Sequence, residues 1–81
     1  MRPPPRILIV EDEPDQLEMY ACALEAEGFV VVPATTGTDA IARSRTIPPD
    51  LVVLDVRLPD MSGWDVCSLL KSEPRTERVP I

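Results

Sequence analysis

The stretch LVVLDVRLPD, residues 51–60, decides the fold. It begins with four apolar residues, and the run then stops on Asp55. Short, unbroken apolar runs are typical of strands in a parallel sheet that is covered on both faces. A charge directly after such a strand lies at the edge where open parallel sheets bind their ligands. The stretch therefore predicts a buried strand over residues 51–54 and a functional carboxylate at its end.

Two similar runs precede this one, ILIV at residues 7–10 and FVVV at residues 29–32. Successive runs start 22 residues apart, which is enough for a strand and a crossover helix. Residues 79–81, VPI, look like the beginning of a fourth strand. Because parallel crossovers are right-handed, the pattern predicts an α/β fold with a doubly wound parallel sheet.

The segments between the runs are predicted helices. The first spans about residues 14–27, with a proline at its first position and a glycine after its end. A second opens at Thr36, which has capping-box spacing to an acidic residue, and must end before Pro48. A third opens with the same spacing at Ser62 and continues to Glu73, where a proline stops it.

Size and charge limit the classes of function. The 81 residues make one small domain, with 14 acidic against 8 basic residues and a net charge of -6. This balance argues against binding to nucleic acid or to anionic membranes. Residues 1–5 are expected to form an extended leader without the apolar middle of a signal peptide, and residues 6–81 to form the domain. We expect a cytoplasmic protein whose partners are proteins or cations.

Several side chains receive ordinary structural interpretations. Cys22 and Cys67 are far apart, and the chain contains no histidine to complete a zinc site or a Cys-His nucleophile. We expect both thiols to be reduced and buried. Trp64 is expected to be a half-buried packing residue, and Lys71 a solvated helix residue.

Carboxylates follow two of the predicted strands. Glu11 and Asp12 come after residues 7–10, and Asp55 comes after residues 51–54. If these strands are neighbours, they lie ~4.8 Å apart. Two carboxylates ~4 Å apart repel by roughly 4 kcal/mol at an effective dielectric constant of about 20. Such a cluster should protonate or bind a cation, and its hard oxygen ligands favour Mg²⁺, with Mn²⁺ able to replace it.

The other acidic residues considered are expected to be solvated, because acids are common at strand ends and in the first turns of helices. These are Glu13, Asp15, Asp39, Asp50, Asp60 and Asp65.

The motifs ILIVEDEP and PDLVVLDVRLPDMSGWD resemble the receiver domain of two-component response regulators, over residues 6–81. The acidic pair after the first strand, Asp55 after the third, and then Pro59 and Gly63 occur in the order that is typical of this family. The resemblance implies a flavodoxin-like fold with strand order 2-1-3.

The resemblance also implies a role for each site residue. Asp55 would accept a phosphoryl group from the phosphohistidine of a sensor kinase or a phosphotransfer protein. Mg²⁺ would be bound directly by Asp12, Asp55 and the backbone carbonyl of Arg57, and through water by Glu11. The domain would be a regulatory phosphoacceptor that assists its own phosphotransfer, and not an enzyme.

The chain departs from the family pattern in its last part. Receivers complete their site with a Ser or Thr after the fourth strand and a Lys after the fifth, and residues 1–81 contain neither element in full. The strand at residues 51–54 would then be an unpaired apolar sheet edge, so we expect the isolated chain either to self-associate through this edge or to fold poorly.

Two alternative functions remain open. A receiver-like module that is not phosphorylated would bind other proteins. A phosphatase of the haloacid dehalogenase type would also use a strand-end aspartate with Mg²⁺. It needs a second aspartate two residues later, where this chain has Arg57.

Overall fold

The three strands form one parallel sheet. The computed structural model describes residues 3–81. Its strands are β1 (Arg6–Val10), β2 (Val30–Ala34) and β3 (Leu51–Leu54). β1 lies in the middle and pairs in parallel with both neighbours, in the order β2-β1-β3. The predicted sheet and its strand order are confirmed.

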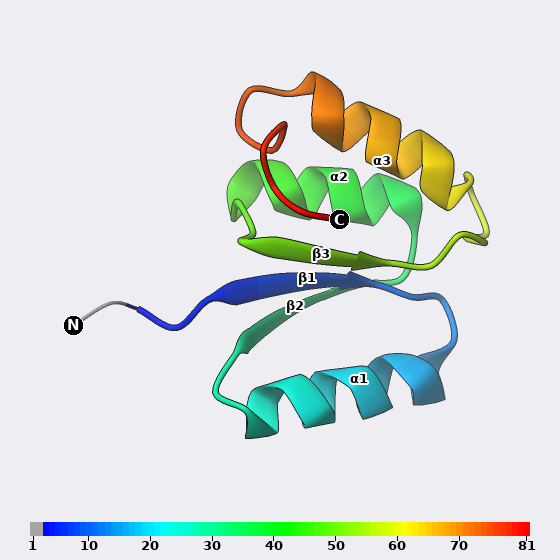
Figure 1. Ribbon diagram of the computed structural model, residues 1–81. Helices are drawn as coiled ribbons and strands as arrows, with labels where there is room; N and C mark the ends of the chain where they lie inside the picture. Colours follow the sequence, from blue (N-terminus) through cyan, green and yellow to red (C-terminus); the bar gives the residue numbers. More distant parts are fainter. Residues whose placement is uncertain (1–2) are drawn as a thin grey trace.

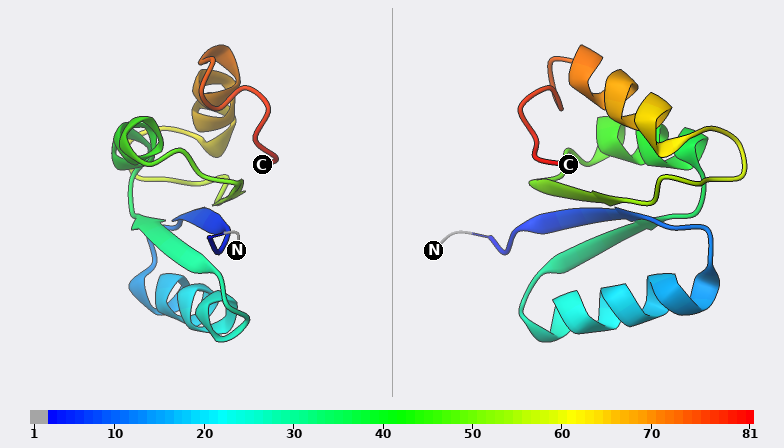
Figure 2. Two further views of the ribbon diagram at one scale, coloured as in Figure 1. Left: turned by 90° about the vertical axis from the view of Figure 1, so that its left-hand side faces the viewer. Right: turned by 45° about the vertical axis from the view of Figure 1, so that its right-hand side comes forward.

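The three helices cover both faces of this sheet (Figures 1 and 2). α1 (Pro14–Ala26) lies on one face, and α2 (Gly37–Thr46) and α3 (Gly63–Ser72) lie on the other. The predicted caps are present at α2 and α3, where the Thr36 and Ser62 hydroxyls accept hydrogen bonds from backbone N–H groups in the first turn. The helix prediction is therefore correct to within a few residues at each end.

The main core lies between the sheet and the pair of helices α2 and α3. β1 is buried from its second residue onward, as expected for a central strand. Its side chains alternate, so Leu8 and Val10 point to α2 and α3, whereas Ile7 and Ile9 lie on the α1 side. The core cluster is Leu8, Val10, Val32, Ala34, Ala40, Ile41, Val52, Val66 and Leu70.

The expected burial of the two cysteines is wrong. Both thiols are free, but Cys22 is exposed and Cys67 is only partly buried. Cys22 lies on α1, which has no buried residue. The neighbouring Ala21, and not Cys22, lies on the half-buried face of that helix. Each residue advances about 100° around a helix, so Cys22 and Cys67 lie beside the inward faces and not on them.

The expected half-burial of Trp64 is also wrong, because its side chain is 72% exposed. Val66 and Leu70 occupy the inward face of α3, and Trp64 precedes Val66 by two positions, about 200° around the helix. Lys71 is exposed as expected. Its ammonium group nevertheless donates a hydrogen bond to the carbonyl oxygen of Val79, at 2.7 Å.

The C-terminal segment returns beside β3 (Figures 1 and 2) without forming the expected first residues of a fourth strand. The Val52 N–H donates to the Pro80 carbonyl oxygen at 3.0 Å, which satisfies one donor on the outer edge of β3. Leu51 and Val53 remain 36% and 38% exposed on the α1 side. β3 is therefore a half-open apolar edge of the described sheet.

The expected leader falls partly outside the described residues, since Met1 and Arg2 are not among them. Pro5 belongs to the sheet in one respect, because its carbonyl oxygen accepts a hydrogen bond from the Val30 N–H at 2.9 Å. Among residues 3–81, none of the helices has the length and apolar character required to cross a membrane.

Candidate metal centre

Three carboxylates meet at the carboxyl ends of β1 and β3. Glu11 and Asp12 follow β1, and Asp55 follows β3. The two strands are paired in register, and the Asp55 N–H donates to the carbonyl oxygen of Val10 at 3.0 Å. This pairing continues β3 one step and fixes the backbone of Asp55 beside β1. One oxygen from each carboxylate lies within 4.8 Å of the others.

The three carboxylates differ in exposure. Glu11 is 6% exposed, Asp55 is partly buried and Asp12 is exposed. Burial, a hydrogen bond with Asp55, and repulsion from the Asp55 and Asp12 carboxylates together raise the pKa of Glu11 above its ordinary value of 4.5. The cluster thus concentrates negative charge, and a cation bound there would relieve the repulsion.

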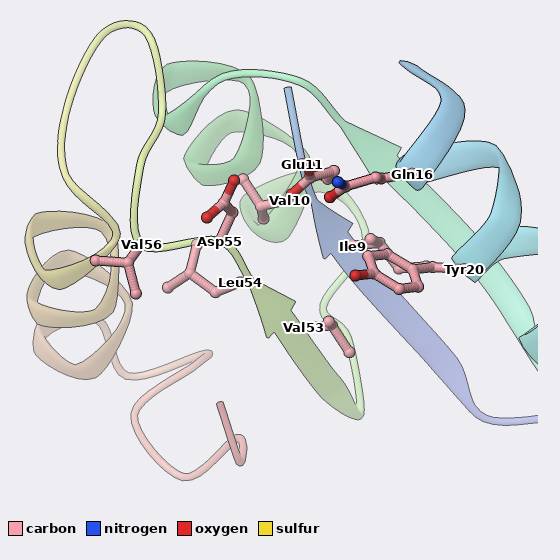
Figure 3. Close-up of a pocket in the computed structure, with 9 residues that line it drawn as sticks. All are labelled: Ile9, Val10, Glu11, Gln16, Tyr20, Val53, Leu54, Asp55 and Val56. Carbon is pink, nitrogen blue, oxygen red and sulfur yellow. The ribbon is translucent and has the colours of Figure 1, made fainter. Parts of the chain in front are cut away.

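A hollow of about 300 Å³ opens beside this cluster on the α1 side of the sheet (Figure 3). Its walls come from β1, β3, the start of the β3–α3 loop and the first two turns of α1. The Glu11 and Asp55 carboxylates lie in it together with apolar side chains, so the acidic group is reachable from solvent. The lining residues are Ile9, Val10, Glu11, Gln16, Tyr20, Val53, Leu54, Asp55 and Val56.

Gln16 lines the hollow but was not predicted to belong to the site. A signal was present, because Gln16 is in the first turn of the helix that directly follows the acidic pair. Helix starts after parallel strands lie at the carboxyl edge of the sheet, where ligands bind.

The loop between β3 and α3 also contacts the side chain of Asp55. The Arg57 N–H donates to Asp55 Oδ1 at 3.1 Å, and the Gly63 N–H donates to the Val56 carbonyl oxygen at 2.7 Å. Arg57 and Ser62 form an isolated antiparallel bridge that closes the loop. A side chain at position 63 would collide with the backbone of Asp55 and Val56. Glycine therefore lets α3 begin directly against the end of β3. Metal binding by the Arg57 carbonyl stays a prediction.

The expectation that Asp60 is merely solvated is wrong. Its Oδ1 accepts a hydrogen bond from the Gly37 N–H at 2.8 Å, and its Oδ2 accepts from the Thr38 N–H at 2.9 Å and the Thr38 hydroxyl at 2.6 Å. These donors lower the pKa of Asp60 from 3.8 to about 2, the largest contribution coming from Thr38. Asp60 thus caps α2 from a loop more than 20 residues away in the sequence.

Three other acidic residues are exposed or nearly so but also have defined partners. The Glu13 carboxylate caps α1 by accepting from the backbone N–H groups of the first turn. Asp50 accepts from the Arg6 N–H at 2.8 Å, at the opposite end of β3 from Asp55. Asp39 pairs with Arg43 at 2.9 Å on the surface of α2. These contacts explain the residues as parts of the fold.

Comparison with known proteins identifies the family. Residues 7–81 match the model of the response regulator receiver domain. The probable transcriptional regulatory protein TcrX of Mycobacterium tuberculosis is 51% identical over 70 residues. That match covers 86% of this chain but only 30% of TcrX.

Solved structures agree with this match. A response regulator from Chloroflexus aurantiacus is 32% identical, with a TM-score of 0.93 over 96% of this chain and 64% of that one. The response regulator TrrA from Thermotoga maritima, solved in complex with Mg²⁺ and BeF, is 32% identical, with a TM-score of 0.83 over 88% of this chain and 62% of that one. The chain therefore belongs to the receiver domain family of two-component response regulators, a family of regulatory domains.

Proposed function

We propose that this receiver domain, beginning at Arg6, accepts a phosphoryl group on Asp55 from the phosphohistidine of a sensor histidine kinase or a phosphotransfer protein. One observation carries the proposal: the carboxylates of Glu11, Asp12 and Asp55 converge within 4.8 Å at the carboxyl edge of the sheet. Asp55 faces an open hollow, so a donor's phosphoryl group can reach it. We also propose that the domain acts in the cytoplasm.

The proposed cofactor is Mg²⁺, and Mn²⁺ is the expected substitute. The converging ligands are all carboxylate oxygens, which suit these hard cations. Asp12 and Asp55 would bind the ion directly, the Arg57 carbonyl would supply a third protein ligand, and the buried Glu11 would act through a bound water. The ion would offset the charge of the incoming phosphoryl group and of the three carboxylates. The solved relative TrrA, which holds Mg²⁺ and BeF, is consistent with this assignment.

The geometry also suggests which oxygen of Asp55 reacts. Oδ1 accepts the hydrogen bond from the Arg57 N–H, which orients the carboxylate and leaves Oδ2 as the nucleophile. Attack of Oδ2 on phosphorus forms the O–P bond as the N–P bond of phosphohistidine breaks, and the imidazole nitrogen regains its electron pair. The product is an aspartyl phosphate whose phosphoryl group carries roughly 1.5 to 2 negative charges. Because the new O–P bond removes the carboxylate charge of Asp55, the edge of the sheet gains about 0.5 to 1 negative charge.

Beryllofluoride binding in the presence of Mg²⁺ tests this proposal, with ¹⁹F NMR as the readout. We expect the parent chain to give a bound fluoride signal that requires Mg²⁺ and that Asp55→Asn abolishes. Asp50→Asn is the matched control, because it makes the same chemical change at the other end of β3 and should preserve the signal. A bound signal in Asp55→Asn equal to that of the parent would disprove the assignment of the acceptor. A parent chain that binds neither Mg²⁺ nor beryllofluoride would favour the non-phosphorylated interaction module.

A further inference from the structure

The hydrogen bonds of one side chain, Asp60, join the loop after Asp55 to the start of α2. Asp60 accepts three hydrogen bonds there, from the Gly37 N–H, the Thr38 N–H and the Thr38 hydroxyl, at 2.6–2.9 Å. A carboxylate at this position also faces the positive end of the α2 dipole. Asp60 therefore joins two segments that lie far apart in the sequence.

Apart from the Arg57–Ser62 bridge that closes it, the loop has few contacts that hold it in place. Its residues Val56, Arg57, Pro59 and Asp60 are all exposed. Leu58 and Met61 are partly buried against the core. Since exposed loop backbone with few apolar contacts opens easily, the position of the loop should depend on its few polar contacts.

The start of α2 is shaped to receive this loop. Gly37 is buried, and a side chain at that position would collide with the side chains of Met61 and Val66. The absence of a side chain at Gly37 thus lets Met61 approach the first turn of α2, next to the point where Asp60 binds. Two adjacent contacts fix the loop to the same turn: the apolar contact of Met61 and the hydrogen bonds of the Asp60 carboxylate.

This loop contacts the proposed phosphoryl acceptor, Asp55. It contains Arg57, whose N–H donates to Asp55 Oδ1 and whose carbonyl is the proposed third metal ligand. We propose that Asp60 is a positioning residue for the phosphoryl site: by tying the β3–α3 loop to the N-terminus of α2, it holds the Arg57 backbone in the orientation that binds the metal. This inference rests on the proposed function of Asp55.

A structural role in α2 alone can be separated from this positioning role. α2 has a second cap, the Thr36 hydroxyl, which accepts from the Asp39 N–H at 3.0 Å and has no hydrogen bond to the loop among the described residues. Thr36→Ala therefore removes a cap from the same helix end and leaves the tie to the loop intact. It is the matched control for Asp60→Ala, because both variants weaken the start of α2 and only one releases the loop.

The experiment measures Mg²⁺ affinity by calorimetry, with amide hydrogen exchange at Arg57 and Gly63 as a second readout. We expect Asp60→Ala to weaken Mg²⁺ binding about tenfold, as loss of outer-shell support does at metal sites. It should also speed exchange at both amides. Thr36→Ala should leave the Mg²⁺ affinity and the exchange of those amides unchanged. Asp60→Asn, which keeps one acceptor oxygen, should fall between the parent and Asp60→Ala, and it replaces Asp60→Ala if that variant does not fold.

The outcomes separate this inference from the proposed function. A parent that binds Mg²⁺ and an Asp60 variant of equal affinity would overturn the positioning role while leaving the phosphoryl site standing. Equal loss of affinity in Thr36→Ala and the Asp60 variant would also overturn it, because α2 stability alone would then explain the effect. If the parent binds no Mg²⁺, both the proposed function and the inference fail.

Discussion

The two faces of the sheet differ in how completely they are covered. On the face toward α2 and α3, nine buried residues form a continuous core that includes Leu8 and Leu70. On the face toward α1, the strands present Ile7 and Ile9, but α1 itself has no buried residue, and Val53 is 38% exposed. The same three strands thus have one closed face and one half-open face.

The closed face provides most of the buried core, whereas the half-open face gives access to the candidate site. The closed face excludes water from apolar side chains, which is the main source of folding free energy. The hollow beside Glu11 and Asp55 opens on the other face, where Gln16 and Tyr20 of α1 form part of its wall. The proposed phosphoryl acceptor, Asp55, needs access to a donor, and the candidate site is on the face where the packing is less complete.

The largest expected effect comes from breaking the closed face. Leu70→Ala should destabilise the domain by about 2–5 kcal/mol, because Leu70 is 1% exposed and its truncation leaves a cavity. Leu17→Ala makes the same change on half-buried α1 and should cost roughly 1 kcal/mol. Urea unfolding of both variants measures the difference. Equal losses would show that the two faces contribute equally.

A smaller effect on the free energy of unfolding is expected from Glu11, which lies beside the hollow on the half-open face. Its raised pKa means that the folded state binds this proton more tightly than the unfolded chain does. Without metal, the free energy of unfolding should therefore fall as the pH rises from 4.5 through the raised pKa of Glu11. Glu11→Gln should remove this fall. Mg²⁺ at a hundred times its Kd should add about 2.7 kcal/mol at neutral pH.

Unfolding curves at several pH values, with EDTA or with Mg²⁺, measure both parts of that prediction. Na⁺ at matched ionic strength controls for general screening. A metal-free stability that rises over the same pH range would contradict the burial and crowding of Glu11.

The smallest change in stability is expected at the outer edge of β3. Val53→Lys replaces an exposed apolar side chain and should alter the free energy of unfolding by less than about 0.5 kcal/mol. Charged residues on edge strands oppose strand pairing between molecules, so the variant should reduce self-association. Light scattering over a concentration series tests this. A parent chain that stays monomeric at every concentration would show that the edge is not used.

Most of the fold could be predicted because its signals are local. The apolar runs at residues 7–10 and 51–54 form strands, as their short unbroken apolar pattern indicates. Thr36 and Ser62 begin helices through contacts with residues three positions away. The exposure of Cys22 and Trp64 was predicted incorrectly. Burial at these positions depends on how far the helix is rotated against its neighbours, which the sequence pattern alone does not give.

Only part of the candidate site could be predicted from the sequence, namely the part that follows from strand pairing. Parallel pairing of β1 and β3 necessarily brings the residues after each strand to the same edge, so the proximity of Asp12 and Asp55 followed from the fold. The three hydrogen bonds of Asp60 did not follow, because its donors are on α2. A contact between two loops depends on their three-dimensional course, which strand patterns do not specify.

The most direct test of the account is transfer of a labelled phosphoryl group from a phosphorylated histidine donor to this chain. The account predicts Mg²⁺-dependent labelling that mass spectrometry places on Asp55. Asp50→Asn should be labelled like the parent, and Asp55→Asn should take no label. Labelling of Asp55→Asn at the parental level, or equal labelling with and without a divalent cation, would contradict the claim that Asp55 is the metal-assisted acceptor.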